Sequence, residues 1–370
     1  MAALAAAVAG AAAGAVGGTP PAGALAAATP APAEAPARPP ATLAQLAGQR
    51  MVVGFPGTTV PASLARSIRR GETGAVILMG GNVRSRSQVV RLTADLQSIP
   101  RPAAVDAPLL IVTDQEGGQV RRIPGPPGRS AVQMGRGSVA STRATGRATG
   151  RLLAGLGIGA ALSPVADVAR PGSVLERFGR TFGRTRGRVA AHSVAFARGL
   201  REGGALATAK HFPGLGVARV NTDDAPVAVR RSRRELERVD LAPFRALIRA
   251  RVPMVMSASA SYPALGSPGP ALLTRRVVTG LLRNRLGFDG VVITDALDTP
   301  ALGAVGPDRA VAVRAARAGN DLLIYIDPAR GAAAARGLRA ALGSGRLDRD
   351  EAERSLERVL ALRETLAAGG

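Results

Sequence analysis

The chain has no cysteine and no tryptophan, and only two tyrosines and two histidines among its 370 residues. Without cysteine it can form no disulfide framework, no thiolate metal site and no cysteine-linked lipid anchor. Aromatic residues make up 2% of the chain while hydrophobic residues reach 46%, so we expect a core built from Ala, Val, Leu and Ile. The length suits either two domains or one large α/β barrel.

Acidic residues are also scarce, because 49 Lys and Arg face 26 Asp and Glu to give a net charge of +23. Such a charge is compatible with nucleic-acid binding, but the chain has few aromatic side chains on which bases could stack. Its arginines are scattered along the sequence and form no dense block. We therefore expect a basic, solvated surface and no nucleic-acid partner.

Two segments at the amino terminus differ from the rest of the chain. Residues 1–16 are nearly all Ala, Val and Gly, which is typical of the apolar part of a signal peptide, although the basic region that usually precedes it is missing. Residues 17–41 are rich in Pro, Ala, Gly and Thr and predict a flexible linker. We thus expect a signal-like segment and linker over residues 1–42, a folded domain over residues 43–370, and export from the cell, with a cytoplasmic location left open.

From Leu43 onward, short apolar segments alternate with helix-like segments, and no later apolar run is long enough to span a membrane. Strands are predicted at residues 51–55, 74–79, 109–114, 158–168, 206–211, 252–257, 290–295 and 321–325. Helices are predicted at residues 87–97, 189–200, 232–251, 274–286, 309–318 and 348–367. This alternation predicts an α/β protein with a single (β/α)8 TIM-type barrel. A dinucleotide-binding sheet is disfavoured because no Gly-rich fingerprint follows the first strand.

The rarest polar residues of the chain stand at the end of the fifth predicted strand. Lys210 is the one lysine of the chain, and His211 beside it is one of the two histidines. Successive side chains of a regular strand point to opposite faces, so both can serve one pocket only where the strand breaks up. Pro213 and Gly214 supply that break.

Other predicted strands also end in polar residues, namely Asp114, Asp167, Met256-Ser257 and Asp295, with Arg180 in the loop after the fourth strand. The carboxyl ends of barrel strands share one face, which is where barrel enzymes carry their active sites. Glycoside cleavage needs two carboxyl groups: one attacks or stabilises the sugar, and the other protonates the leaving oxygen. The strand ends therefore indicate a pocket suited to cleaving glycosides.

Six motifs, in this order along the chain, resemble the catalytic barrel of glycoside hydrolase family 3, and in particular its single-domain bacterial β-N-acetylglucosaminidases. They are TDQEGGQVRR at 113–122, SPVADV at 163–168, RTFG at 180–183, AKHFPG at 209–214, MSA at 256–258 and LGFDGVVITDAL at 286–297. The resemblance implies that Asp295 is the nucleophile of a retaining mechanism and that Met256 lines the sugar subsite. It also implies no metal or organic cofactor. The sugar-binding residues that it implies are Asp114, Arg122, Arg180, Lys210 and His211.

The chain departs from this family pattern in the loop after the fifth strand. In the glucosaminidases that loop ends in an Asp-x-His dyad that acts as general acid and base, but here Asn221 stands at the Asp position and Asp223 at the His position. The two-domain glucosidases of the family take this group from a second domain, which we do not expect in a chain that ends at Gly370. Three hypotheses remain: Asp223 or Asp224 replaces the dyad, hydrolysis is slow or absent, or the substrate supplies the acid.

The sequence therefore predicts a retaining β-glycoside hydrolase that releases β-linked N-acetylglucosamine, or a related sugar, from cell-wall-type glycans such as peptidoglycan fragments. It is expected to be secreted or associated with the cell wall. The alternative is a catalytically impaired glycan-binding protein on the same barrel. Because the dyad is missing, the sequence leaves the choice between N-acetylhexosamine, glucose and xylose open.

Overall fold

The computed structural model describes residues 17–18 and 38–367. The predicted signal-like segment at residues 1–16 and most of the predicted linker lie outside these residues. Within the described part of the chain, no helix combines the length and apolar character needed to cross a bilayer.

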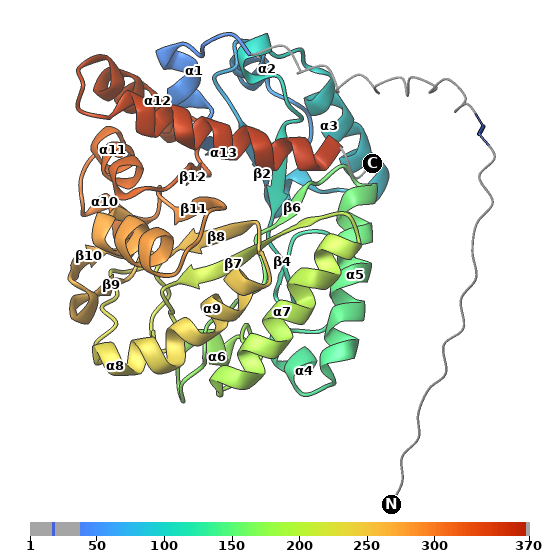
Figure 1. Ribbon diagram of the computed structural model, residues 1–370, viewed down its shortest axis with the longest axis vertical. Coiled ribbons are helices and arrows are strands. Elements are labelled where there is room, and N and C mark those ends of the chain that lie inside the picture. The colour runs from blue at the N-terminus through green and yellow to red at the C-terminus, as the bar shows by residue number, and fades with distance from the viewer. Residues whose placement is uncertain (1–16, 19–37, 368–370) are drawn as a thin grey trace, which may run out of the picture. The chain divides into compact units, whose positions relative to one another are not determined.

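Eight parallel strands close into a barrel in the order β1-β12-β11-β8-β7-β6-β3-β2, with helices arranged around it (Figure 1). This confirms the predicted (β/α)8 TIM-type fold. The barrel strands are β1 Met51–Val53, β2 Ala75–Leu78, β3 Leu110–Thr113, β6 Ala160–Ala161, β7 Leu206–Phe212, β8 Met254–Ser257, β11 Val291–Ala296 and β12 Leu322–Tyr325. Two small antiparallel pairs lie outside the barrel: β4 Gln115–Gly117 with β5 Val120–Arg121, and β9 Ser261–Tyr262 with β10 Ser267–Pro270.

Several helices begin at capping residues that the sequence supplies. The side chain of Ser85 accepts a hydrogen bond from the backbone N–H of Gln88 at the start of α3, and Asp327 caps α12 in the same way. The α-helices are α1 Leu43–Gly48, α2 Ala62–Arg69, α3 Arg86–Ser98, α4 Ala131–Gly135, α5 Val139–Gly155, α6 Val174–Arg177, α7 Arg186–Glu202, α8 Arg233–Glu235, α9 Leu241–Arg249, α10 Pro300–Gly303, α11 Asp308–Ala318, α12 Pro328–Gly343 and α13 Arg349–Ala367. Two π-helices, η3 Leu236–Asp240 and η6 Arg276–Arg285, and four 3₁₀ turns, η1 Gly80–Asn82, η2 Ala103–Val105, η4 Pro263–Leu265 and η5 Ala271–Leu273, complete the described elements.

Two sequence predictions differ from the structure in extent. The strand predicted over residues 158–168 is wrong in length, because β6 covers only Ala160–Ala161. Pro164 has no backbone N–H to donate, and Val165 makes only an isolated bridge to Lys210. The prediction also missed α5 and α12, in which many small residues and arginines weaken the apolar periodicity of a helix.

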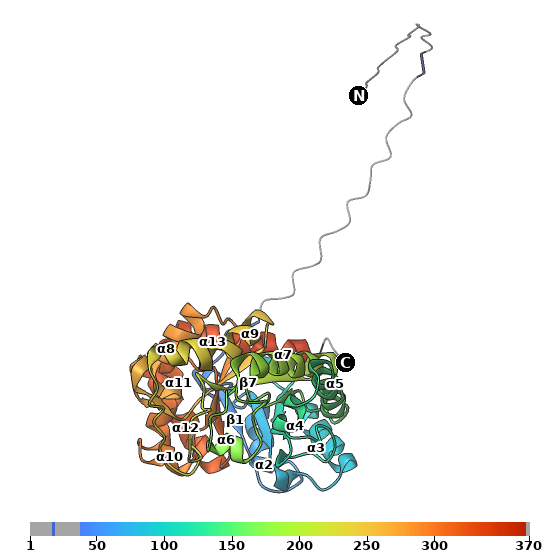
Figure 2. The same cartoon turned by 90° about the horizontal axis from the view of Figure 1, so that it is seen from below.

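Inward-pointing side chains fill the barrel. They alternate along each strand, for example Met254 and Met256 on β8 and Val291 and Ile293 on β11. At the end where the strands begin, α13 covers the barrel, and Leu362 joins the same apolar cluster. Figure 1 shows α13 crossing the barrel, and Figure 2 shows it near one end. The opposite end, where the strands finish, is therefore the end available for a pocket.

Helices α5 and α7 pack with their backbones in close contact. Gly146 and Gly150 of α5 face Gly199 and Gly203 of α7 across this contact. A Cβ added at Gly150 would lie 2.3 Å from the carbonyl oxygen of Leu200. Only glycine leaves room for two helix backbones to approach this closely.

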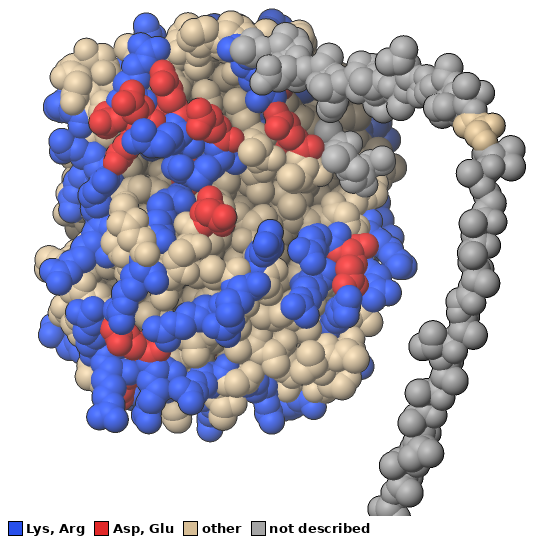
Figure 3. All heavy atoms as spheres, in the orientation of Figure 1, with Lys and Arg blue, Asp and Glu red and all other residues tan. Residues whose placement is uncertain are grey.

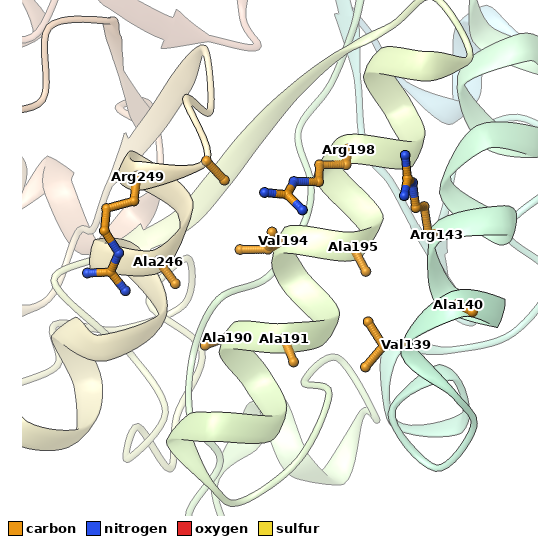
Figure 4. Close-up of a pocket in the computed structure, with 11 residues that line it drawn as sticks. Val139, Ala140, Arg143, Ala190, Ala191, Val194, Ala195, Arg198, Ala246 and Arg249 are labelled. Carbon is orange, nitrogen blue, oxygen red and sulfur yellow. The ribbon is translucent and has the colours of Figure 1, made fainter. Parts of the chain in front are cut away.

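The outer surface is strongly basic, and arginines cover much of the face seen in Figure 3. A shallow groove of about 600 Å³ lies where α5, α7 and α9 meet. Figure 4 shows short alanine and valine side chains inside this groove and Arg143, Arg198 and Arg249 around it. The hollow exists because such short side chains do not fill the space between the three helices.

Candidate active site

Along each strand, every second side chain points into the barrel. This alternation continues beyond the core to the end of the barrel where the strands finish. On β11 the residue that follows Val291 and Ile293 in the series is Asp295, and on β3 the residue that follows Leu110 and Val112 is Asp114. Alternation along a strand therefore delivers both carboxylates to one cavity. Apolar side chains that also line this cavity include Ile77, Leu162, Met256 and Ile324.

This cavity has a volume of about 620 Å³, within the usual range for small-molecule sites. Every residue to which the sequence assigned a catalytic or sugar-binding role lines it, except Asp224. Those residues are Asp114, Arg122, Arg180, Lys210, His211, Asp223, Met256 and Asp295. The structure thus brings together residues that lie up to 181 positions apart, from Asp114 to Asp295.

A bulge at the end of β7 lets two adjacent residues serve this one cavity. Ala209 pairs with Val255 of β8, but the next pairing joins Phe212 to Ser257, so three steps along β7 match two along β8. The extra residue of such a bulge changes the direction of the side chains around it. Both Lys210 and His211 consequently reach the cavity, and the peptide bond between them is cis.

Lys210 is held by two carboxylates. Its Nζ lies 3.0 Å from Asp114 Oδ1 and 2.7 Å from Glu116 Oε1. Burial alone would lower the pKa of Lys210, but the two negative charges outweigh burial and raise it. The ammonium group is therefore charged at neutral pH.

Two arginines complete this ionic cluster. Arg180 donates two hydrogen bonds to Glu116, at 2.8 and 2.7 Å, and Arg122 lies 3.3 Å from Asp114 Oδ2. Burial would raise the pKa of Glu116, yet Arg180 and Lys210 hold it well below its usual range. For Asp114, too, burial is opposed by the charges of Lys210 and Arg122, and its pKa is lowered. Both carboxylates are thus ionised at neutral pH.

Asp167 orients His211. Its Oδ2 lies 2.7 Å from His211 Nδ1, and its two oxygens also accept hydrogen bonds from the backbone N–H groups of His211 and Leu215. Asp167 is fully buried. The pairing at Nδ1 leaves Nε2 as the ring nitrogen free to contact a ligand in the cavity.

Asp295 lines the cavity at the end of β11, and its pKa is raised. Burial raises the pKa of Asp295 and the nearby negative charge of Asp223 raises it further, while His211 and Lys210 oppose the shift. The backbone N–H of Ala296 donates to Asp295 Oδ1 at 2.9 Å. The outcome is a carboxylate that is fixed in position and more basic than an exposed aspartate.

Comparison with known proteins identifies this barrel. The model of the glycosyl hydrolase family 3 N-terminal domain matches residues 42–362. The chain belongs to glycoside hydrolase family 3. Its curated relatives include an uncharacterized secreted glycosyl hydrolase from Arthroderma benhamiae, 38% identical over 333 residues that cover 88% of this chain and 94% of the relative. A β-hexosaminidase from Tolumonas auensis is 33% identical over 294 residues, which cover 77% of this chain and 84% of that protein.

Solved structures of the same family superpose closely on this barrel. A family 3 β-N-acetylglucosaminidase from Paenibacillus sp. gives a TM-score of 0.84 at 34% identity, covering 90% of this chain and 64% of that one. A β-N-acetylhexosaminidase from Beutenbergia cavernae gives 0.81 at 30% identity, covering 88% of this chain and 99% of that one. The chain is thus a β-N-acetylhexosaminidase-like glycoside hydrolase of family 3.

In this family 3 barrel the structure separates the two adjacent aspartates of the loop after β7. Asp223 lines the cavity, and its Oδ2 accepts a hydrogen bond from Asn221 Nδ2 at 3.2 Å. Both aspartates are exposed, but Asp224 lies outside the set of cavity-lining residues. Of the two candidate replacements for the dyad, the geometry therefore favours Asp223.

Three carboxylates take part in this family 3 site without having been assigned a role from the sequence. Glu116 and Asp167 stood in the motifs, but nothing in a sequence shows that they would pair with Lys210 and His211. Asp298 also lines the cavity, where burial raises its pKa. Its place three residues after Asp295, just past the end of β11, was the available signal.

Proposed function

We propose that this family 3 barrel is a retaining β-glycoside hydrolase that releases β-linked N-acetylglucosamine, with Asp295 as the nucleophile. The observation that carries the proposal is the position of Asp295 in the cavity, facing the ionic cluster around Lys210. Retaining cleavage needs an ionised carboxylate next to the bound sugar and a second group that donates a proton. The sugar itself is inferred from the relatives named β-hexosaminidase and β-N-acetylglucosaminidase.

In the first step a carboxylate oxygen of Asp295 bonds to the anomeric carbon while the bond from that carbon to the leaving oxygen breaks. The leaving oxygen takes its proton from Asp223, and the sugar remains as an ester on Asp295. In the second step Asp223 takes a proton from water, the hydroxide attacks the anomeric carbon, and Asp295 is released as a carboxylate. Both aspartates return to their starting protonation states.

The remaining residues of the cavity would bind the sugar. Lys210 and Arg180, already fixed by Glu116, would donate hydrogen bonds to hydroxyl or carbonyl oxygens. Asp114 would accept from a hydroxyl, and Met256 would offer an apolar surface to the ring. Because ion pairs hold these groups in place before the sugar arrives, little conformational entropy would be lost on binding.

We further propose that the substrate is a cell-wall-type glycan such as a peptidoglycan fragment and that the protein works outside the cell. The net charge of +23 favours association with anionic wall polymers. One relative carries the description secreted in its name.

A second candidate function is that of a glycan-binding protein with little or no turnover. The loop after β7 has lost its dyad, and neither histidine of the chain lies in that loop. His211 is engaged by Asp167, while His192 packs on Phe182 and lies 2.8 Å from Thr142 Oγ1. If Asp223 does not act as an acid, a substrate that carries its own acidic group would be the remaining route to hydrolysis.

The test is a turnover assay of the wild type and of Asp295→Asn. The substrates are an aryl β-N-acetylglucosaminide, the matching aryl β-glucoside and an unactivated β-linked disaccharide. We expect the wild type to prefer N-acetylglucosamine and to cleave the disaccharide. Asp295→Asn should lower kcat/KM roughly 10⁴-fold or more. The acidic limb of the pH profile should lie above the ordinary aspartate pKa of about 3.9, because activity needs Asp295 ionised and its pKa is raised.

Other outcomes would change the assignment. Unchanged activity in Asp295→Asn would remove this residue as the nucleophile. Cleavage of the aryl glycosides alone would mean that the nucleophile works without a partner acid. Sugar binding without turnover of any substrate would support the glycan-binding function instead.

A further inference from the structure

At the opposite end of the barrel, where the strands begin, arginines surround a second, smaller cavity of about 140 Å³. Arg50 stands just before β1, Asp321 just before β12, and Glu351 on α13. The charged residues that line the cavity are Arg50, Arg275, Arg283, Arg354, Arg358, Asp321 and Glu351. Five positive charges face two negative ones, so this cavity has an excess of three positive charges.

Both carboxylates are already paired with other arginines. Asp321 Oδ1 accepts two hydrogen bonds from Arg358, at 3.1 and 2.9 Å, and its Oδ2 accepts from Arg283 and from the backbone N–H of Val292. Glu351 accepts two from Arg275, at 2.8 and 3.3 Å. Each oxygen of Asp321 thus accepts two hydrogen bonds, and both oxygens of Glu351 are paired with Arg275.

Arg50 forms no direct ion pair with any described residue, although the charges of Asp321 and Glu351 offset part of the effect of burial on its pKa. It is 7% exposed, and its two terminal nitrogens donate only to the backbone carbonyls of Asn320 and Glu351. Its Nε is buried and has no hydrogen-bond partner among the described residues. A buried, unpaired guanidinium is costly, and burial accordingly lowers the pKa of Arg50 to about 10.

A second arginine at this cavity is also free. Arg354 lies on the exposed face of α13, and its side chain makes no ion pair or hydrogen bond with any described residue. The volume of the cavity equals that of roughly four to five water molecules, which suits a compact anion of five heavy atoms better than a nucleotide. Guanidinium groups recognise the oxygens of such an anion by paired hydrogen bonds.

We propose that this cavity is a binding site for a tetrahedral oxyanion of the phosphate class, held by Arg50 from inside and by Arg354 at the rim. The anion would supply the missing partner of Arg50 and neutralise part of the charge excess. The barrel separates this cavity from the candidate active site. A bound anion would therefore stabilise the folded state by mass action and take no part in the reaction. The site does not depend on the proposed function.

The test uses calorimetric titration and thermal unfolding of the whole chain with inorganic phosphate, against sodium chloride at matched ionic strength. We expect saturable binding of phosphate and a higher Tm than in chloride. Arg354→Gln should weaken phosphate binding about tenfold, since it removes one charge-assisted contact. The matched control is Arg339→Gln on α12, an exposed arginine outside this cavity whose loss also removes one charge. It should leave the Kd unchanged.

Two further measurements make the proposal falsifiable. Arg50→Met should abolish phosphate binding, and if that variant fails to fold the comparison of Arg354→Gln with Arg339→Gln still decides. A titration with glycerol 3-phosphate separates the sources of the anion, because binding as tight as that of phosphate would extend the class to phosphorylated end groups. Absence of saturable phosphate binding, or equal weakening by Arg354→Gln and Arg339→Gln, would overturn the site.

Discussion

Among single residues, Asp223 carries the most weight, because the proposed mechanism makes turnover of unactivated glycans depend on it. It occupies the position at which the family dyad has histidine, and it lines the cavity that contains Asp295. Its negative charge helps to raise the pKa of Asp295. Asp223 and Asp295 therefore face the same cavity, as the two carboxyl groups of the proposed first step must.

Exchange of Asp223 for asparagine should separate the two loop aspartates by function. Asp223→Asn should slow cleavage of an unactivated disaccharide by roughly 10²–10⁴-fold, the usual loss for a general acid. An aryl glycoside with a good leaving group should be affected much less. Asp224→Asn, one position along, is the matched control and should keep wild-type rates. Steady-state kinetics on both substrates measure this. If both variants behave alike, Asp298 becomes the next candidate acid, because it lines the same cavity and burial raises its pKa.

At the scale of elements, the contact between α5 and α7 depends on the absence of side chains. Gly150 and Gly203 lie so close that a Cβ on Gly150 would stand 2.9 Å from the Cα of Gly203. Helix α7 is followed by β7 after a short turn. We therefore expect the position of α7 to influence where β7 begins, and with it the position of Lys210 along the barrel axis. Packing on the outside of the fold is in this way connected to the site.

Gly150→Ala should destabilise the protein by about 1–3 kcal/mol, since the new methyl group must push the two helices apart. Gly155→Ala, at the end of the same helix, meets nothing within 4 Å. That control should be neutral or stabilising by up to about 1 kcal/mol, because alanine restricts the unfolded chain. Chemical denaturation of the two variants gives the comparison, and equal stabilities would contradict the close-contact model.

The barrel and most of its strands were predictable because apolar runs buried on both faces leave a clear pattern in the sequence. The residues at the strand ends followed from the same alternation, as Asp114 and Asp295 show. Helix α5 was not predictable, because its buried face is made of glycine and threonine and carries little hydrophobic signal. Nor could the sequence show that Glu116 pairs with Lys210 or that Arg50 Nε is buried without a hydrogen-bond partner among the described residues. Both features depend on contacts between distant segments.

For the whole molecule, the charge of +23 is the dominant electrostatic feature. Like charges repel one another in the compact state, and this repulsion destabilises the fold at low ionic strength. The Debye length falls from about 30 Å at 0.01 M to about 10 Å at 0.1 M salt. Salt therefore screens the repulsion between distant arginines more strongly than it screens the buried ion pairs around Lys210.

We expect the Tm to rise by a few degrees when sodium chloride is increased from about 0.01 to 0.2 M at neutral pH, and then to level off. Differential scanning calorimetry measures this directly, and the chloride series also serves as the baseline for the phosphate experiment. A Tm that falls with added chloride would mean that surface ion pairs contribute more than the net repulsion costs.

The ionic cluster around Lys210 has a practical consequence for chemical labelling of the protein. Apart from the amino terminus, this residue carries the one primary amine in the chain, and it is 3% exposed with its pKa raised by two carboxylates. Reagents that acylate amines, such as activated esters of dyes or coupling resins, need an accessible and uncharged nitrogen. On the folded protein they would find no side chain to modify, so a label on Lys210 would mark the molecules that had lost their structure.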